Sequence, residues 1–265
     1  MKRFIILLNS MGINLKAFFI FWKELPSVYK DYRKLKKQKG NNTDFFFGRS
    51  HIITKDKHAS SGIMSGHYFH QDLLIARKIF LANPVKHVDI GSRTDGFVAH
   101  VAVFRKIEIF DIREQTGKIE NVVYTRADLM KLPKEMENYC DSVSALHSIE
   151  HFGLGRYGDP VDYHGYIKAI DNITQMLKPS GMFYFSVPIG TQRIEFNAHR
   201  VFSLPFLWNI LKKHYRLKSF SYVDDAGNLH ENVEFTDVSI ENSFHCEYGC
   251  GIFELQKETV DVKKL

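Results

Sequence analysis

Hydrophobic positions from residue 63 onward alternate between strand-like and helix-like segments. Short apolar runs such as "HVDIG" and "MFYFSVP" are typical of buried strands, and "QDLLIARKIFLAN" has apolar residues at helical spacing. This alternation predicts an α/β domain over residues 63–265, with a mostly parallel sheet and helices on both faces. The last two strand-like segments, "RLKSFSYVDDAGN" and "CGIFELQK", predict an antiparallel strand at the sheet edge.

Residues 1–40 have a different pattern, in which aromatic and basic residues form two segments, "LKAFFIFWKELP" and "SVYKDYRKLKKQKG". We expect amphipathic helices here, with a break or kink at Pro26, a cap at Ser27 and an end at Gly40. Residues 41–62 are polar and predict a linker or loop. The sequence has no run of 18 uncharged apolar residues, so we expect no membrane-spanning helix.

The net charge of +6 is concentrated in this N-terminal arm. Residues 1–40 carry ten of the 36 basic residues and two of the 30 acidic ones, which leaves the rest of the chain near neutral. A nucleic-acid enzyme more often places positive charge around its cleft, so we expect no nucleic-acid partner. A basic, aromatic-rich amphipathic arm predicts binding to an anionic membrane surface; packing on the domain or on a second subunit is the alternative.

Three scattered cysteines, Cys140, Cys246 and Cys250, favour reduced thiols and the cytoplasm, with the arm giving a peripheral position at a membrane. Cys246, Cys250 and the adjacent His245 have the chemistry of three zinc ligands. No second pair completes such a site, so we expect core-facing thiols.

The strand ends of the predicted domain carry a candidate nucleotide site. Gly91, in "VDIGSRTDGF", permits a sharp turn and a close approach of backbone N–H groups to a ligand, and the following helix points its N-terminus there. Asp111 ends the second strand, where an acid accepts hydrogen bonds from ribose hydroxyls. Asp128 and Leu129 follow the third strand and offer a polar edge and an apolar face to an adenine.

The series "VDIGS", Asp111, "ADL", "CDSVSALHSIEHF" and "LKPSGMFYFSVP" resembles the class I S-adenosylmethionine-dependent methyltransferases over residues 85–190. The resemblance implies a Rossmann-like fold and S-adenosylmethionine as cofactor. It places the methionine part at the turn that begins with Asp89 and Gly91, the ribose at Asp111, and the adenine at Asp128 and Leu129.

The glycine turn departs from the D/E-x-G-x-G-x-G pattern of that family, because Arg93 and Asp95 stand where later glycines are usual. We expect Gly96 to compensate by a one-residue shift, or Arg93 to contact the methionine carboxylate. A turn too crowded for the cofactor would instead keep the fold and lose binding. The G-x-G-x-x-G of dinucleotide-binding dehydrogenases is absent.

A further resemblance extends over nearly the whole chain, through segments such as "SGHYFHQDLLIARKIF", "EHFGLGRYGDPVD" and "SYVDDAGNLHENV". These segments resemble a domain-of-unknown-function family first described from nematode proteins. Its bacterial members resemble proteins associated with surface-polysaccharide synthesis. The resemblance implies a sugar or lipid-linked glycan intermediate as the acceptor.

The stretch "HSIEHFGLGRYGDP" contains the pattern H-x-x-E-H, which in zinc peptidases lies on a helix. A strand-like segment precedes it and glycines follow it, so a peptidase is excluded. The methyltransferase resemblance places it beside the methyl group, where His151 is a candidate general base. A divalent cation between His147, Glu150 and His151, with Asp159 as a further ligand, is a second interpretation. In a third, Glu150 and His151 only order the loop.

The segment "IEFNAHRVF" follows the fifth strand, where such enzymes bind the acceptor. Asn197 and Arg200 are candidate acceptor-binding residues and His199 is a second candidate base, with a hydrogen-bonded loop as the alternative. Tyr68, in "SGHYFHQD", is a further candidate acceptor-binding residue and is expected in a lid over the cofactor.

Together these features predict an S-adenosylmethionine-dependent O-methyltransferase that acts on a sugar or glycan intermediate. One alternative is a non-catalytic binding or scaffold protein on the same fold, favoured by Arg93. The other is a metal-dependent hydrolase or transferase that uses His147, Glu150 and His151.

Overall fold

The computed structural model describes residues 8–131 and 133–259. The chain divides into two compact units, Met1–Ile63 and Met64–Leu265.

The first unit is built around one helix, α2 (Leu15–Lys39), which passes through Pro26 without interruption. Asn14 caps its start by accepting a hydrogen bond from the Ala17 N–H at 2.8 Å, and Gly40 ends it with φ of +49°. The end at Gly40 is as predicted, but the break at Pro26 and the cap at Ser27 are not found. A proline removes one helical hydrogen bond, and the helical turns on both sides maintain the helix across this gap. Residues 41–62 are mostly irregular, with one short turn, η1 (Asp56–His58).

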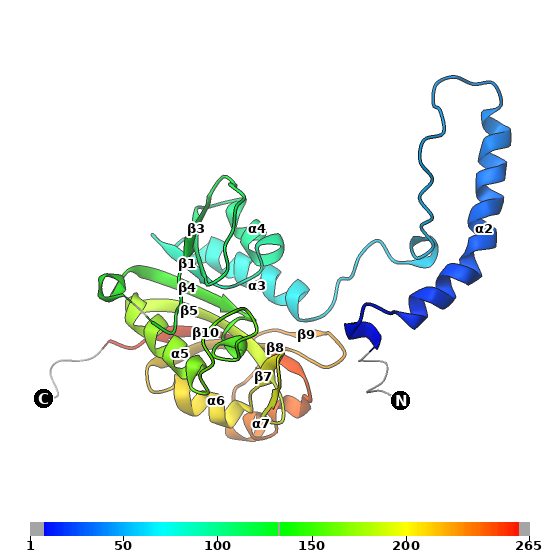
Figure 1. Cartoon of the computed structure of the whole chain (residues 1–265). Coiled ribbons are helices and arrows are strands. Elements are labelled where there is room, and N and C mark those ends of the chain that lie inside the picture. Colours follow the sequence, from blue (N-terminus) through cyan, green and yellow to red (C-terminus); the bar gives the residue numbers. More distant parts are fainter. Residues whose placement is uncertain (1–7, 132, 260–265) are drawn as a thin grey trace, which may run out of the picture. The chain divides into compact units, whose positions relative to one another are not determined.

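The second unit contains an eight-stranded sheet with the order β3-β2-β1-β4-β5-β10-β8-β9 (Figure 1). The strands are β1 (His87–Ile90), β2 (Ile107–Asp111), β3 (Val122–Arg126), β4 (Cys140–Leu146), β5 (Leu177–Ile189), β8 (Tyr215–Val223), β9 (Leu229–His230) and β10 (Gly249–Lys257). Strands β1 to β5 are parallel where they pair. The predicted α/β fold with a mostly parallel sheet is therefore confirmed.

The last strand in the sequence, β10, is inserted between β5 and β8 and runs antiparallel to both. Cys250 pairs with Pro188 of β5 and with Val223 of β8. Because β10 is antiparallel, its beginning lies at the edge where the parallel strands end. Residues at the start of β10 are thus brought to the edge at which α/β sheets bind ligands.

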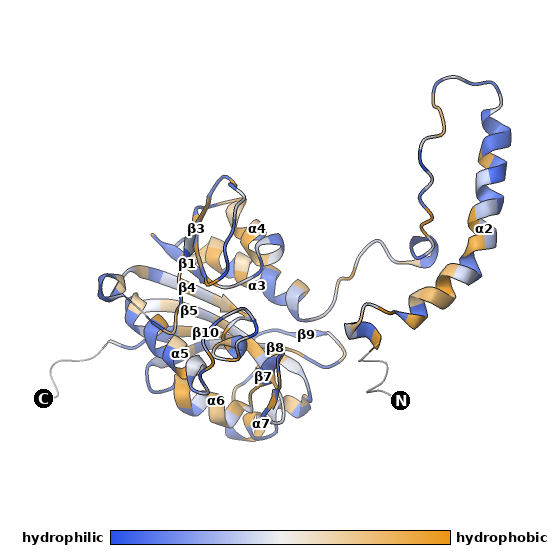
Figure 2. Cartoon of the chain, in the orientation of Figure 1, coloured by the Kyte–Doolittle hydropathy of each residue, from blue (hydrophilic) through white to orange (hydrophobic). Residues whose placement is uncertain are grey.

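Helices cover both faces of the sheet (Figure 1). One face packs α3 (His67–Ala82), the π-helical turn η2 (Thr94–Val98) and α4 (Ala99–Ala102) into an apolar cluster. The other face packs α5 (Gly165–Met176) and α6 (Leu204–Leu211) into a second one. In Figure 2 α5 shows hydrophilic residues, whereas α6 is largely hydrophobic. The remaining elements are η3 (Lys134–Met136), η4 (Ile149–His151), the hairpin β6 (Arg193–Glu195) and β7 (His199–Val201), α7 (Asp237–Glu241) and η5 (Ser243–His245).

A chain of buried polar groups crosses the α3 side of the core. Ser144 Oγ donates to Asp89 Oδ1 at 2.5 Å, and His87 lies between Ser142 Oγ at 2.8 Å and Ser144 Oγ at 3.1 Å. Since Ser144 gives its proton to Asp89, it accepts one from His87 Nε2, which leaves Nδ1 to accept from Ser142. Burial lowers the pKa of His87 to about 3, so the ring is neutral.

We expect His87 to make the domain acid-sensitive. Below pH 6.5 this ring is protonated in the unfolded chain, whereas in the folded chain it stays neutral down to about pH 3. The free energy of unfolding therefore falls as the pH falls. Between pH 7 and pH 5, wild type should lose about 2 kcal/mol more free energy of unfolding than His87→Asn. Urea unfolding at the two pH values measures this difference. An equal loss in both proteins would contradict the buried neutral histidine.

Candidate active site

A cleft with a volume of about 320 Å³ opens at the carboxyl ends of β1, β2, β3 and β4. This size lies in the range of small-molecule sites, and β1, flanked by β2 and β4, is the switch point where α/β sheets bind ligands. The lining residues are Tyr68, Gly91, Arg93, Phe110, Asp111, Ile112, Arg113, Ala127, Asp128, Leu129, His147, Ser148, His151, Phe152, Arg156, Tyr157 and Asp159.

The glycine turn after β1 forms the floor of the cleft. Gly91 has φ of +68°, and a Cβ there would lie 3.3 Å from Ser148 Cβ, so the position requires glycine. Asp89 lies beneath this turn, fully buried, and accepts hydrogen bonds from the Ser92 N–H at 2.9 Å and Ser92 Oγ at 2.7 Å. Burial raises the pKa of Asp89 to about 6. Asp89 therefore supports the turn and does not line the cleft, so the predicted cofactor contact is indirect.

The departure from the glycine motif has two separate structural consequences. Gly96 does not line the cleft; a Cβ on it would lie 2.6 Å from Asp72 Oδ2, so this glycine permits close packing of η2 on α3. Arg93 lines the cleft, but its guanidinium is paired with Asp95 at 2.7 Å. It also lies 5.6 Å from the ring centre of Tyr68.

Asp111 lies in the cleft at the end of β2, as predicted for a ribose ligand, but it already has a partner. Arg113 Nε lies 3.0 Å from Oδ1 and Arg113 Nη2 lies 2.5 Å from Oδ2. The same guanidinium lies 4.7 Å from the ring centre of Tyr157 across the cleft. Arg113 is not among the residues that the sequence pattern predicts for the site, although its place two residues beyond a strand end is a usable signal.

Asp128 and Leu129 lie on the wall of the cleft, as their position after β3 predicts. Asp128 Oδ1 accepts from the Met130 N–H at 2.9 Å, which fixes the turn. Leu129 is buried, and with Phe110, Ala127 and Phe152 it makes this wall apolar. A planar base with a polar edge fits these surroundings.

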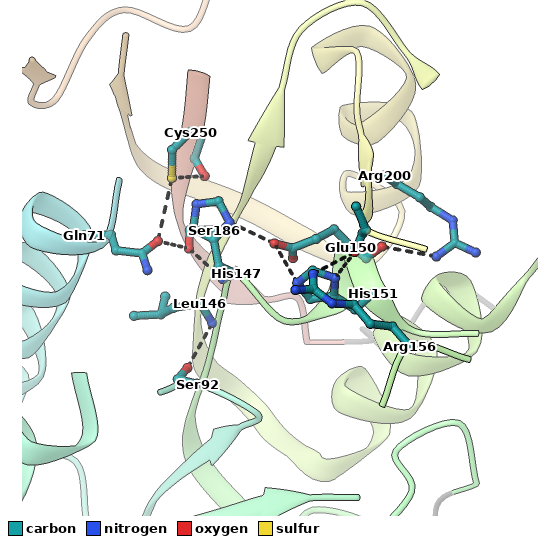
Figure 3. A network of polar contacts seen from close by, with 12 residues as sticks. Gln71, Ser92, Leu146, His147, Glu150, His151, Arg156, Ser186, Arg200 and Cys250 are labelled. Atoms are coloured by element: carbon teal, nitrogen blue, oxygen red, sulfur yellow. Dashed lines mark hydrogen bonds and ion pairs between the residues drawn. The ribbon is translucent and has the colours of Figure 1, made fainter. Parts of the chain in front are cut away.

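His147 and Glu150 are buried hydrogen-bond partners at the end of β4 (Figure 3). His147 Nδ1 lies 2.8 Å from Glu150 Oε1, while His147 Nε2 and Glu150 Oε2 have no hydrogen-bond partner. His147 also has a left-handed backbone with φ of +49°, a conformation that costs about 1–2 kcal/mol for a residue with a Cβ. Glu150 Oε1 also lies 3.7 Å from His151 Nε2, so the predicted set of His147, Glu150 and His151 lies together around this carboxylate.

His151 is the predicted base that lies in the cleft with its acceptor nitrogen fixed. Its Nδ1 lies 2.6 Å from the Ala198 carbonyl oxygen, so Nδ1–H donates and Nε2 carries the lone pair. Burial lowers the pKa of His151, which keeps the ring neutral at neutral pH. Such a ring is suited to accept a proton.

Two predicted acceptor-binding residues, Asn197 and Arg200, belong to the hairpin β6–β7. Asn197 lies in the turn of the hairpin, exposed, with φ of +56°. Arg200 is buried and donates to the carbonyl oxygens of Glu150, Phe152 and Tyr163 (3.3, 2.6 and 3.1 Å), so it holds the loop together. Neither residue is among those that line the cleft, and their acceptor role stays a prediction.

Two aromatic groups predicted near the site have different positions. Tyr68 lines the cleft and lies 5.1 Å, between ring centres, from His147. His199 lies outside the lining, 6.3 Å from the ring of His151. Arg156 and Tyr157, in the glycine-rich loop after η4, also line the cleft and are not among the residues that the sequence pattern predicts.

The chain matches one family of proteins of unknown function. Residues 96–245, more than half of the chain, match the family described as "Caenorhabditis protein of unknown function, DUF268", and the chain belongs to this family. No curated protein sequence matches the chain.

Solved methyltransferases share the fold at low sequence identity. The 1,6-didemethyltoxoflavin-N1-methyltransferase of Burkholderia thailandensis, with bound S-adenosylhomocysteine, matches 92% of this chain and 90% of its own, with 14% identity and a TM-score of 0.52. The N-methyltransferase NodS of Bradyrhizobium japonicum WM9 matches 74% of this chain and 100% of its own, with 11% identity and a TM-score of 0.50. The fold is therefore Rossmann-like and of the class I methyltransferase type.

The [4+2]-cyclase SpnF also shares this fold. It matches 72% of this chain and 81% of its own, with 14% identity and a TM-score of 0.50. The fold alone thus does not define the reaction, and the residues of the cleft must carry the functional argument.

Proposed function

We propose that the chain is an S-adenosylmethionine-dependent O-methyltransferase. The observation that carries this proposal is one cleft that collects a glycine turn, a strand-end acid, an apolar wall and a neutral histidine from four adjacent strands. Gly91 allows the methionine part to approach the backbone, Asp111 accepts from the ribose hydroxyls, and Asp128 and Leu129 bind the adenine. The cofactor supplies an activated methyl group.

His151 acts as the base in this proposal. Its Nδ1–H is held by the Ala198 carbonyl, so Nε2 accepts the proton of the acceptor hydroxyl. Most of the rate comes from alignment of the hydroxyl with the methyl donor, and the base adds a smaller factor.

The acceptor in this proposal is a sugar or lipid-linked glycan intermediate of surface-polysaccharide synthesis. The resemblance of bacterial family members to proteins of that process supports this choice. Tyr68, Tyr157 and Arg156 at the cleft also support it, since aromatic rings and a guanidinium suit the faces and hydroxyls of a sugar.

A non-catalytic binding protein is the second candidate, and the Asp111–Arg113 pair favours it. Both oxygens of Asp111 are occupied by a guanidinium of the same chain. In the methyltransferase proposal, the half-exposed Arg113 moves away when the ribose binds.

Calorimetry with S-adenosylhomocysteine separates the two candidates. We expect saturable binding to wild type, and a loss of about 10- to 100-fold in affinity for Asp111→Ala, because hydrogen bonds to a charged group are lost. Arg113→Ala should bind as tightly as wild type or more tightly. Arg216→Ala, which alters a surface arginine bonded to Gln256, is the control. In the same series, His151→Ala should keep the affinity and lower turnover about 10²- to 10⁴-fold.

Wild type that gives no binding heat at near-millimolar nucleotide would support the non-catalytic candidate and end the methyltransferase proposal. Unchanged turnover in His151→Ala would remove the base role and leave the cofactor site standing.

We further propose that α2 lies on an anionic membrane surface. None of the described helices has the length and apolar content to cross a bilayer. The first half of α2 is apolar and its second half is basic (Figure 2). The side chains of Phe18, Phe19 and Trp22 are 57%, 68% and 58% exposed, and no described residue of α2 is buried. Burial of aromatic rings at the headgroups together with lysine attraction is the binding mode of such helices.

Trp22 provides the test, because the chain has one other tryptophan, Trp208. In a Trp208→Phe variant, vesicles rich in phosphatidylserine should shift the Trp22 emission to the blue and co-sediment with the protein. Phosphatidylcholine vesicles should give neither effect, and a protein without residues 1–40, which lacks Trp22, should not co-sediment. Equal sedimentation with and without the arm would contradict the proposal, and a concentration-dependent shift without vesicles would favour contact with a second subunit.

A further inference from the structure

Three groups with metal-ligand chemistry converge behind the cleft. Among the described residues, the side-chain ligand atoms of His67, His147 and Cys250 all lie within 4.8 Å of one another. They come from the first residue of α3, the residue after β4 and the second residue of β10. The insertion of β10 beside β5 is what brings Cys250 to this edge (Figure 3).

His147 is held in the orientation of a metal ligand. Glu150 Oε1 lies 2.8 Å from Nδ1, so Nδ1–H donates to the carboxylate and Nε2 presents a lone pair. This Nε2 is buried and has no hydrogen-bond partner. Cys250 and Glu150 raise the pKa of His147 to about 10, so a metal ion that binds Nε2 displaces a proton there. A carboxylate on the far nitrogen of a histidine ligand is a common second layer of zinc sites, where it fixes the ring and raises its basicity.

The other two groups complete a compact set. The His67 ring is stacked on that of His147, with 5.1 Å between centres and 9° between planes. Cys250 is fully buried, and its Sγ lies 3.7 Å from Gln71 Oε1. Ser186 Oγ donates to that same oxygen at 2.6 Å, which keeps Gln71 in place.

We propose that His67, His147 and Cys250 bind one zinc ion. Two imidazoles and a thiolate are ligands that zinc prefers. Zn–N distances of about 2.0–2.1 Å and a Zn–S distance of about 2.3 Å require the ligand atoms to lie within about 4 Å of one another. Small side-chain rotations close the present cluster to that separation. Binding releases the proton of the Cys250 thiol to solvent as the Zn–S bond forms.

Three protein ligands leave a fourth coordination position, as in catalytic zinc sites. His147 Nε2 and Cys250 are buried, and the ion would lie on the side of His147 that faces away from Glu150 and His151, so a water molecule would fill this position.

This site differs from the cation site that the sequence predicts. The two share His147, but Glu150 is here a positioning residue that acts through His147. His151 Nδ1 is engaged by the Ala198 carbonyl, and His151 lies outside the converging set.

Cobalt substitution of the full chain, after removal of metals by a chelator, tests the site without any activity assay. We expect one Co²⁺ per chain, with visible ligand-field bands and a near-ultraviolet thiolate-to-cobalt charge-transfer band, both abolished by zinc. Cys250→Ser should lose the charge-transfer band, and His67→Ala should weaken binding at least about tenfold. Glu150→Gln should keep the spectrum and lower the affinity about 10- to 100-fold. Cys246→Ser, which changes another buried cysteine near β10, is the matched control.

Circular dichroism establishes that each variant is folded. The proposal is overturned if wild type shows no charge-transfer band, or if the band survives in Cys250→Ser. If Cys246→Ser loses the band and Cys250→Ser retains it, the thiolate ligand is Cys246, and the proposal is also overturned. Calorimetry with S-adenosylhomocysteine on the same samples keeps the two proposals separate, because cobalt binding without nucleotide binding supports the metal site alone.

Discussion

The buried carboxylate of Asp89 is the constraint on which the geometry of the cleft depends. It accepts hydrogen bonds from the backbone and side chain of Ser92 and from Ser144, so one group ties β1, the glycine turn and β4 together. Ser92 Oγ in turn accepts from the Leu146 N–H at 3.2 Å, one residue before His147. A buried carboxyl without these partners would cost several kcal/mol, so the turn and the two strand ends hold their positions jointly. This arrangement fixes the positions of Gly91 and His151 in the cleft, because they follow β1 and β4.

The groups at the mouth of the cleft are less constrained. The guanidinium groups of Arg93 and Arg113 are each paired with an acid two residues away, and both are about half exposed. Asp95 is exposed as well, so water replaces its partner at little cost. The Asp111 side chain is only 9% exposed, so a ligand that displaces Arg113 has to replace its hydrogen bonds to this carboxylate. The turn after β1 is fixed, whereas Arg93 and Arg113 can move. A cleft of the methyltransferase type is therefore compatible with an Asp111 that is paired with Arg113.

The periodicity of the sequence predicts the sheet and its helices because burial on one or both faces imposes it. The same pattern places Gly91, Asp111, Asp128 and His151 at strand ends that the structure brings to one cleft.

Contacts between residues distant in the sequence are what the sequence does not predict. The strands of the β6–β7 hairpin are too short to give a periodic signal. In this hairpin Asn197 lies in the turn, and Arg200 donates to three carbonyl oxygens. Cys250 looks like a core thiol until the antiparallel insertion of β10 places it beside His67 and His147. The helix through Pro26 shows that a single breaker does not end a helix whose turns on both sides are stable.

A crystal structure of the chain soaked with S-adenosylhomocysteine tests the central claim most directly. The account predicts electron density along the cleft, with the ribose hydroxyls on Asp111, the adenine between Asp128 and Leu129, and Arg113 moved off the carboxylate. An empty cleft at saturating nucleotide, with Arg113 still on Asp111, would contradict it.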